Sequence, residues 1–213
     1  MVIEVVKVKY NEQDAGAVSF NTETGVGAFE FESRFIKSGI ELSPIKMPLS
    51  KTIYSFPENT NATFKGLPGM IADSLPDYFG NAVMNAWIAS QGKSPSDITP
   101  LQRLQYTGKR GMGALTYSPA IQRKNLNRSQ QIEIQPLISI AQELLNKRKK
   151  FQVTIGSQGQ EDKEAMMALF SVGMIAGGAR AKAVLAFNSD FTQVRSGQAN
   201  APEGFTHFVM KFD

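Results

Sequence analysis

The sequence predicts an α+β protein in which a strand-rich first part precedes a helical middle and further strands near the end. Apolar and polar residues alternate along most of the first thirty positions, as they do in half-buried strands. Between Tyr78 and Ile88 the apolar residues instead recur at the three-and-four spacing of an amphipathic helix. Of 213 residues, 42% are hydrophobic and 20% are charged, which indicates a folded chain with a core rather than a disordered one.

The first part should form a meander of antiparallel strands. Residues 3–10 alternate in polarity and are followed by turn residues at 11–14. Two further apolar runs, at 15–20 and 26–31, flank a polar loop at 21–25. Beyond them, prolines at positions 44, 48 and 57 divide the chain into short extended pieces.

Two helices with recognisable ends follow. Asp77 is placed to cap a helix that runs through Ile88, and Gly92 is placed to end it. Thr99 and Pro100 form the N-cap and first position of a shorter helix. A turn rich in glycine, at 108–113, then leads into a strand at 114–117.

A polar, unpatterned stretch at 120–131 predicts a boundary between a domain at 1–120 and a domain at 121–213. The second domain should begin with an amphipathic helix at 136–146 and a further helix at 161–172. A glycine turn, a strand from about Ala181, a short strand and a final strand that carries Lys211 complete the prediction.

The glycine turn and the final lysine together form a candidate phosphate-binding site. Gly177 and Gly178 allow backbone N–H groups to approach a phosphate closely, and Lys211 could reach the same phosphate as a point charge. In Rossmann and Walker sites the glycines follow a strand and open a helix, but here they open a strand, as they do in kinases. Spacing alone also allows a plain tight turn beside a surface lysine.

Three segments in register resemble the HipA-like family of bacterial serine/threonine kinases, the toxin components of toxin–antitoxin pairs. Residues 64–80 are similar to that family's DSLPDGWG stretch, and residues 99–115 are similar to its TPLDRLAYVGRRGMGAL stretch. Residues 177–183, Gly-Gly-Ala-Arg-Ala-Lys-Ala, resemble its GGARPKA loop, and Lys211-Phe212 resembles its nucleotide lysine. The resemblance extends over essentially the whole chain.

This resemblance implies that the second domain is the beginning of a kinase-like N-lobe, with ATP and Mg²⁺ as the cofactors of the full-length protein. It implies a small DNA-binding antitoxin as partner and leaves the protein substrate open. The ATP-binding residues that it implies are Gly177, Gly178, Ala179, Arg180, Lys182 and Lys211. Where many members carry a serine that is autophosphorylated to switch the kinase off, this chain has Ile175, so that switch is in doubt.

The resemblance also indicates what the chain lacks. Family members are considerably longer, and their catalytic aspartate and metal-binding residues lie beyond the matched part. We therefore expect no catalytic and no metal-binding residue within this chain, which by itself should be inactive. The alternative is a non-catalytic binding module that docks an antitoxin or a separately encoded kinase half.

The remaining features favour structural roles. The chain has no cysteine, a net charge of +4, no signal peptide and no apolar stretch that could span a membrane, and we expect a cytoplasmic protein. The basic run at 147–150 suits a helix end better than nucleic-acid binding. We interpret His207 as a strand-face residue and Trp87 as core, whereas Lys109 and Arg110 could face a partner or the nucleotide.

Overall fold

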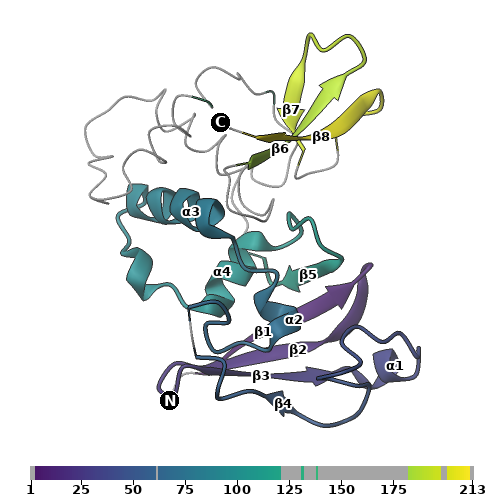
Figure 1. Ribbon diagram of the computed structural model, residues 1–213, viewed down its shortest axis with the longest axis vertical. Coiled ribbons are helices and arrows are strands. Elements are labelled where there is room, and N and C mark those ends of the chain that lie inside the picture. The colour runs from purple at the N-terminus through teal and green to yellow at the C-terminus, as the bar shows by residue number, and fades with distance from the viewer. Residues whose placement is uncertain are drawn as a thin grey trace. The chain divides into compact units, whose positions relative to one another are not determined.

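The computed structural model describes residues 3–60, 62–120, 182–197 and 201–211, together with Gln131 and Ile138 (Figure 1). The chain divides into two compact units. The first comprises Met1–Leu75 and Ile98–Ile121, and the second comprises Pro76–Asp97 and Gln122–Asp213. The segment 76–97, which the sequence assigned to the first domain, therefore groups with the second unit. The predicted helices at 136–146 and 161–172 lie outside the described residues, apart from Ile138.

The first unit is built on a five-stranded antiparallel sheet with the order β4-β3-β2-β1-β5. Its strands are β1 (Ile3–Tyr10), β2 (Gln13–Asn21), β3 (Val26–Phe31), β4 (Tyr54–Ser55) and β5 (Leu115–Ser118). This confirms the predicted meander. The first turn is shorter than predicted, because Asn11 and Glu12 both adopt a positive φ and close a two-residue hairpin.

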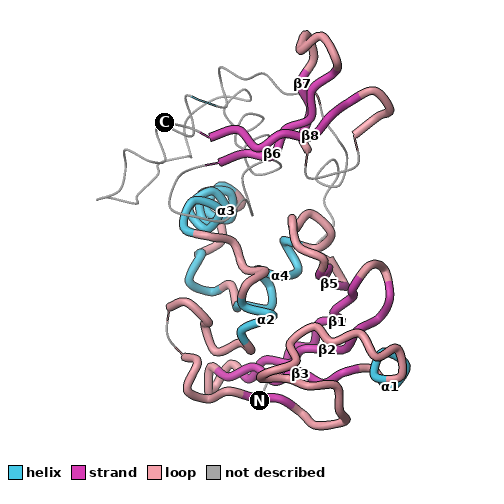
Figure 2. Tube along the Cα trace, turned by 45° about the vertical axis from the view of Figure 1, so that its right-hand side comes forward, coloured by secondary structure: helices cyan, strands magenta, loops and turns pink. Residues whose placement is uncertain are grey.

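One face of this sheet carries the core of the first unit. Alternation buries Val6, Val8, Val18 and Phe29 on that face, each at most 1% exposed. The short helices α1 (Ser33–Ile36) and α2 (Gly69–Ala72) and the longer α4 (Pro100–Thr107) add apolar side chains to the same core (Figure 2). Each fully buried side chain of this size contributes about 1.5–3 kcal/mol. Burial of these shared apolar faces holds the helices against the sheet.

The long connection from β4 to α2 is fastened to the start of β3. The Gly66 carbonyl accepts a hydrogen bond from the backbone N–H of Gly27, and the Gly66 N–H donates one to the carbonyl of Asn59, both at 2.7 Å. The φ of Gly66 is +78°, which favours glycine. A Cβ built there would lie 1.8 Å from the backbone oxygen of Gly25, so only glycine fits.

In the second unit the described residues form a helix, a 3₁₀ turn and a small sheet. Helix α3 (Tyr78–Ser90) starts at Asp77, whose carboxylate accepts a hydrogen bond from the backbone N–H of Gly80 at 2.7 Å. The turn η1 (Pro95–Asp97) follows it. The sheet is antiparallel with the order β7-β6-β8, formed by β6 (Lys182–Asn188), β7 (Val194–Ser196) and β8 (Phe205–Lys211). These three strands confirm the predicted strand from about Ala181, the short strand and the final strand that carries Lys211.

Candidate phosphate-binding site

Two lysines of the predicted site lie directly opposite each other at one end of the small sheet. The antiparallel register of β6 and β8 pairs Lys182 with Lys211. Opposed residues in such a pair point to the same face, with their Cβ atoms about 5 Å apart. Lys182 is half-buried and Lys211 is exposed. Two ammonium groups held this close on one face can both contact a single bridging anion.

The same face continues from this lysine pair into an apolar row and then into a second basic group. Two residues along the strands, Val184 is paired with Val209, of which Val184 is 6% and Val209 is 48% exposed. After two more residues, Ala186 is paired with His207 on one side and with Arg195 on the other. The order of surfaces along the face is therefore basic, apolar and basic. Because a strand rises about 3.3 Å per residue, these rows are roughly 7 Å apart.

The basic residues at the far end of the face belong to recognisable local structure. The Arg195 guanidinium lies 5.5 Å from the ring centroid of Phe205, within the range of a cation–π interaction. His207 is an exposed residue of β8, which confirms its interpretation as a strand-face residue. The prediction did not connect it with the lysines, although its position four residues before Lys211 on an alternating strand was a usable signal.

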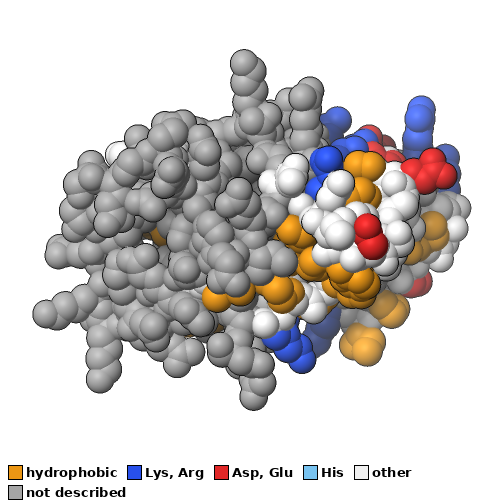
Figure 3. Space-filling view, turned by 90° about the horizontal axis from the view of Figure 1, so that it is seen from above, with side chains coloured by type: hydrophobic (Ala, Val, Ile, Leu, Met, Phe, Trp, Pro, Cys, Tyr) orange, Lys and Arg blue, Asp and Glu red, His pale blue; other side chains and the backbone are white. Residues whose placement is uncertain are grey.

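The opposite face of the small sheet is aromatic. The rings of Phe187, Phe191 and Phe208 pack against one another, with centroids 5.5–5.6 Å apart. Phe191 is 63% exposed and Phe208 is 40% exposed. Figure 3 shows hydrophobic side chains exposed among the described residues on the face that it draws. The two faces therefore differ in chemistry, and it is the lysine-bearing face that can attract phosphate.

The other predicted members of the site are not described. Gly177, Gly178, Ala179 and Arg180 lie outside the described residues, as does Ile175. The structure thus brings together Lys182 and Lys211, two of the predicted ATP-binding residues, while the glycine turn stays a prediction. Within the described part of the chain, no three His, Cys, Asp or Glu side chains are placed to hold a metal ion.

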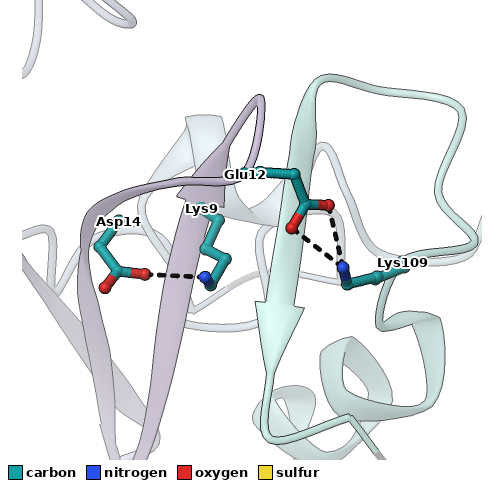
Figure 4. A network of polar contacts seen from close by, with 4 residues as sticks. All are labelled: Lys9, Glu12, Asp14 and Lys109. Atoms are coloured by element: carbon teal, nitrogen blue, oxygen red, sulfur yellow. Dashed lines mark hydrogen bonds and ion pairs between the residues drawn. The ribbon is translucent and has the colours of Figure 1, made fainter.

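Lys109 and Arg110, which the sequence offered as residues facing a partner or the nucleotide, have different environments, and Arg110 is buried. Lys109 donates to both carboxylate oxygens of Glu12 at 2.9 Å, close to the ion pair that Lys9 and Asp14 form at 3.2 Å (Figure 4). Arg110 is only 3% exposed, and burial lowers the pKa of its guanidinium to about 10. A buried guanidinium cannot reach a partner in solution, so the hypothesis that both residues face a ligand is not supported for Arg110.

The motif residues at the helix starts have structural roles. Thr99 is the N-cap of α4, as predicted, and with Gln102 it forms a complete capping box. The Glu4 carboxylate extends this box, because it accepts hydrogen bonds from the Thr99 hydroxyl at 2.5 Å and from the Gln102 amide at 3.1 Å. Trp87 is 1% exposed, which confirms its assignment to a core.

Comparison with known proteins gives a family match for the first part of the chain, which does not include the lysine pair. A family model described as the HipA N-terminal domain matches residues 6–118, more than half of the chain. The chain is also similar to the HipA of a Shewanella oneidensis MR-1 toxin–antitoxin complex of HipA, HipB and operator DNA. That match has a TM-score of 0.49 and 17% sequence identity, and it covers 92% of this chain but 39% of the Shewanella chain. A search of curated proteins found no match. Among the described helices, none is long and apolar enough to cross a membrane.

Proposed function

The chain belongs to the HipA N-terminal domain family, and from this premise we propose that it is the nucleotide-phosphate-binding portion of a HipA-like, ATP-dependent protein serine/threonine kinase. The single observation that carries the proposal is the register pair of Lys182 and Lys211. Two ammonium groups held on one face of a sheet suit a polyphosphate better than a single carboxylate, because each can meet a different phosphate group.

The donor set on this face fits ATP. Lys182 and Lys211 would hold phosphate oxygens, and the adjoining Val209, which is 48% exposed, offers an apolar surface on which a purine can pack. The predicted glycine turn at 177–178 shortly precedes β6 and would add backbone N–H donors. Bound Mg²⁺–ATP supplies the phosphoryl group that is transferred, and the residues of this chain would orient its phosphates and neutralise their charge.

The proposal covers only part of a kinase. Phosphoryl transfer also needs carboxylates that hold Mg²⁺ and a residue that positions the acceptor hydroxyl. By the resemblance, these carboxylates would come from the part of a longer protein that lies beyond the matched segments. We propose that this chain by itself does not catalyse, and that the longer protein is a toxin whose partner is a DNA-binding antitoxin.

Calorimetric titration of the 213-residue chain with Mg²⁺–ATP tests the proposal. We expect Lys211→Met and Lys182→Met each to weaken binding about tenfold or more, because each removes a charge-assisted hydrogen bond. The matched control is Lys37→Met, which removes an exposed lysine of the first unit and should leave the affinity unchanged. Equal ATP affinity of the wild type and both variants, with all of them folded, would refute the assignment.

A further inference from the structure

The loop between α1 and β4 exposes isoleucine to an unusual degree. We call residues 37–53 the isoleucine loop. Ile45 is 90% exposed, Ile53 is 63% exposed and Ile40 is 36% exposed. Single exposed apolar residues are common on protein surfaces, but three isoleucines in one loop, one of them almost fully in water, call for an explanation.

Contacts within the isoleucine loop and at its end hold it in a defined conformation, so its exposed side chains do not result from disorder. Met47 anchors its middle in the core at 1% exposure, and the Met47 N–H donates to the carbonyl of Ser43 at 2.8 Å. The Tyr54 hydroxyl donates to the Pro48 carbonyl at 2.5 Å and lies 2.8 Å from the Ser50 hydroxyl. The first bond closes a turn just before the anchor, and the other two fasten the segment after the anchor to Tyr54. A surface held in one conformation loses little entropy when it binds.

The charges beside the exposed isoleucines are mostly positive. Lys37, Lys46 and Lys51 are all exposed, whereas Glu41 is the only acidic residue of the loop. Lys46 adjoins Ile45 directly in sequence, and Lys51 is two residues from Ile53. Within the described part of the chain, none of the three lysines takes part in an ion pair. Apolar side chains bordered by cations match a ligand that carries apolar side chains bordered by carboxylates.

We propose that the isoleucine loop is a docking surface for a segment of another protein in which apolar side chains are flanked by Asp or Glu. Ile45 and Ile53 would supply the apolar contact, while Lys46 and Lys51 would select acidic partners and speed the encounter. An anionic membrane is the less favoured occupant, because interfacial binding relies on amphipathic helices with aromatic anchors, and this loop contains neither. The inference is independent of nucleotide binding.

Selection from a display library of random twelve-residue peptides, with the folded chain as bait, tests this proposal. Enriched peptides should combine Leu, Ile or Phe with neighbouring Asp or Glu. Ile45→Ser should weaken the binding of a synthetic copy about tenfold, and so should the double variant Lys46→Glu/Lys51→Glu. The controls Val5→Ser and Lys7→Glu alter exposed residues of β1 and should have no effect. Because every changed side chain is exposed, each variant should keep the wild-type melting temperature.

Three results would overturn the proposal. Enrichment of peptides without acidic residues, or binding that Ile45→Ser leaves unchanged, would exclude this ligand chemistry or this surface. Failure to enrich any peptide would do the same, and Ile45-dependent binding to vesicles of phosphatidylglycerol and phosphatidylcholine would then assign the loop to membranes. ATP titration of the same variants should match the wild type, which separates this proposal from the proposed function.

Discussion

Gly66 connects two parts of the first unit that are distant in sequence. Its backbone bonds to Gly27 and Asn59, and its Cα lies against the backbone of Gly25. The family-like stretch at 64–80 therefore includes a position where a side chain would displace the β2–β3 turn. The physical requirement at this position is close backbone approach combined with a positive φ.

Gly66→Ala should destabilise the chain by about 3 kcal/mol or more, because the added methyl meets backbone that cannot move away. Gly39→Ala is the matched control, since Gly39 has a φ of +70° but a Cβ added there would meet nothing within 4 Å. That control should cost only about 1 kcal/mol, the cost of the left-handed conformation itself. Urea unfolding of both variants measures the difference, and equal losses would show that the close approach is not limiting.

Because of Tyr117, the free energy of unfolding of the first unit falls at alkaline pH. Burial raises the pKa of its phenol above the ordinary value of 10.0. The native state therefore keeps this proton where the unfolded chain releases it, and stability that is complete below pH 10 falls as the pH rises further.

We expect the unfolding free energy of the wild type to fall more steeply than that of Tyr117→Phe between about pH 10 and pH 11.5, by up to about 1.4 kcal/mol per pH unit. Urea titrations at several pH values, with pH 7 as the common reference, provide the measurement. Parallel pH profiles for the two proteins would contradict a raised phenol pKa.

At the scale of elements, side-chain hydrogen bonds join the start of α4 to strand β1 of the sheet. Thr99 and Gln102 cap the helix and at the same time donate to Glu4 of β1, about a hundred residues earlier in the chain. The Glu12–Lys109 pair also joins distant segments, but it is exposed and open to screening by salt.

A double-mutant cycle of Glu4→Ala and Thr99→Ala should give a coupling energy of at least about 0.5 kcal/mol, and Thr99→Ala alone should cost about 1–2 kcal/mol. The cycle of Glu12→Ala and Lys109→Ala should give a smaller coupling that disappears at about 1 M salt. Urea unfolding of each variant gives the unfolding free energies for both cycles. If the Glu4 cycle were additive, Glu4 would not contribute to the cap.

Elements with a clear local signal were predictable from sequence, and the others were not. Alternation predicted β1 to β3, and the caps at Asp77 and Thr99 predicted where α3 and α4 begin. The helices α1 and α2 have four residues each, too few to show a period. From the sequence, Arg110 could have faced a partner or the nucleotide, and its burial depends on tertiary packing that no local pattern shows.

At the scale of the whole molecule, the sequence predicted the two site lysines but not that they are paired. Lys182 and Lys211 were each assigned through the resemblance, whereas their register depends on how β6 and β8 align over their full length. The alignment also places His207 and Arg195 on the lysine face, at positions that no motif marks. Under the proposed function this chain supplies cations for the phosphates, and the remainder of a longer kinase supplies the carboxylates.

Amide NMR spectra of the chain during titration with Mg²⁺–ATP test the central claim most directly. The account predicts the largest shift changes at 182–184 and 209–211, weak changes in the first unit, and loss of the response in Lys211→Met. The same titration with adenosine should be weaker, because adenosine lacks the phosphates that the lysines would bind. Shift changes confined to the first unit, or an ATP response that Lys211→Met leaves intact, would contradict the assignment of this lysine pair to nucleotide phosphate.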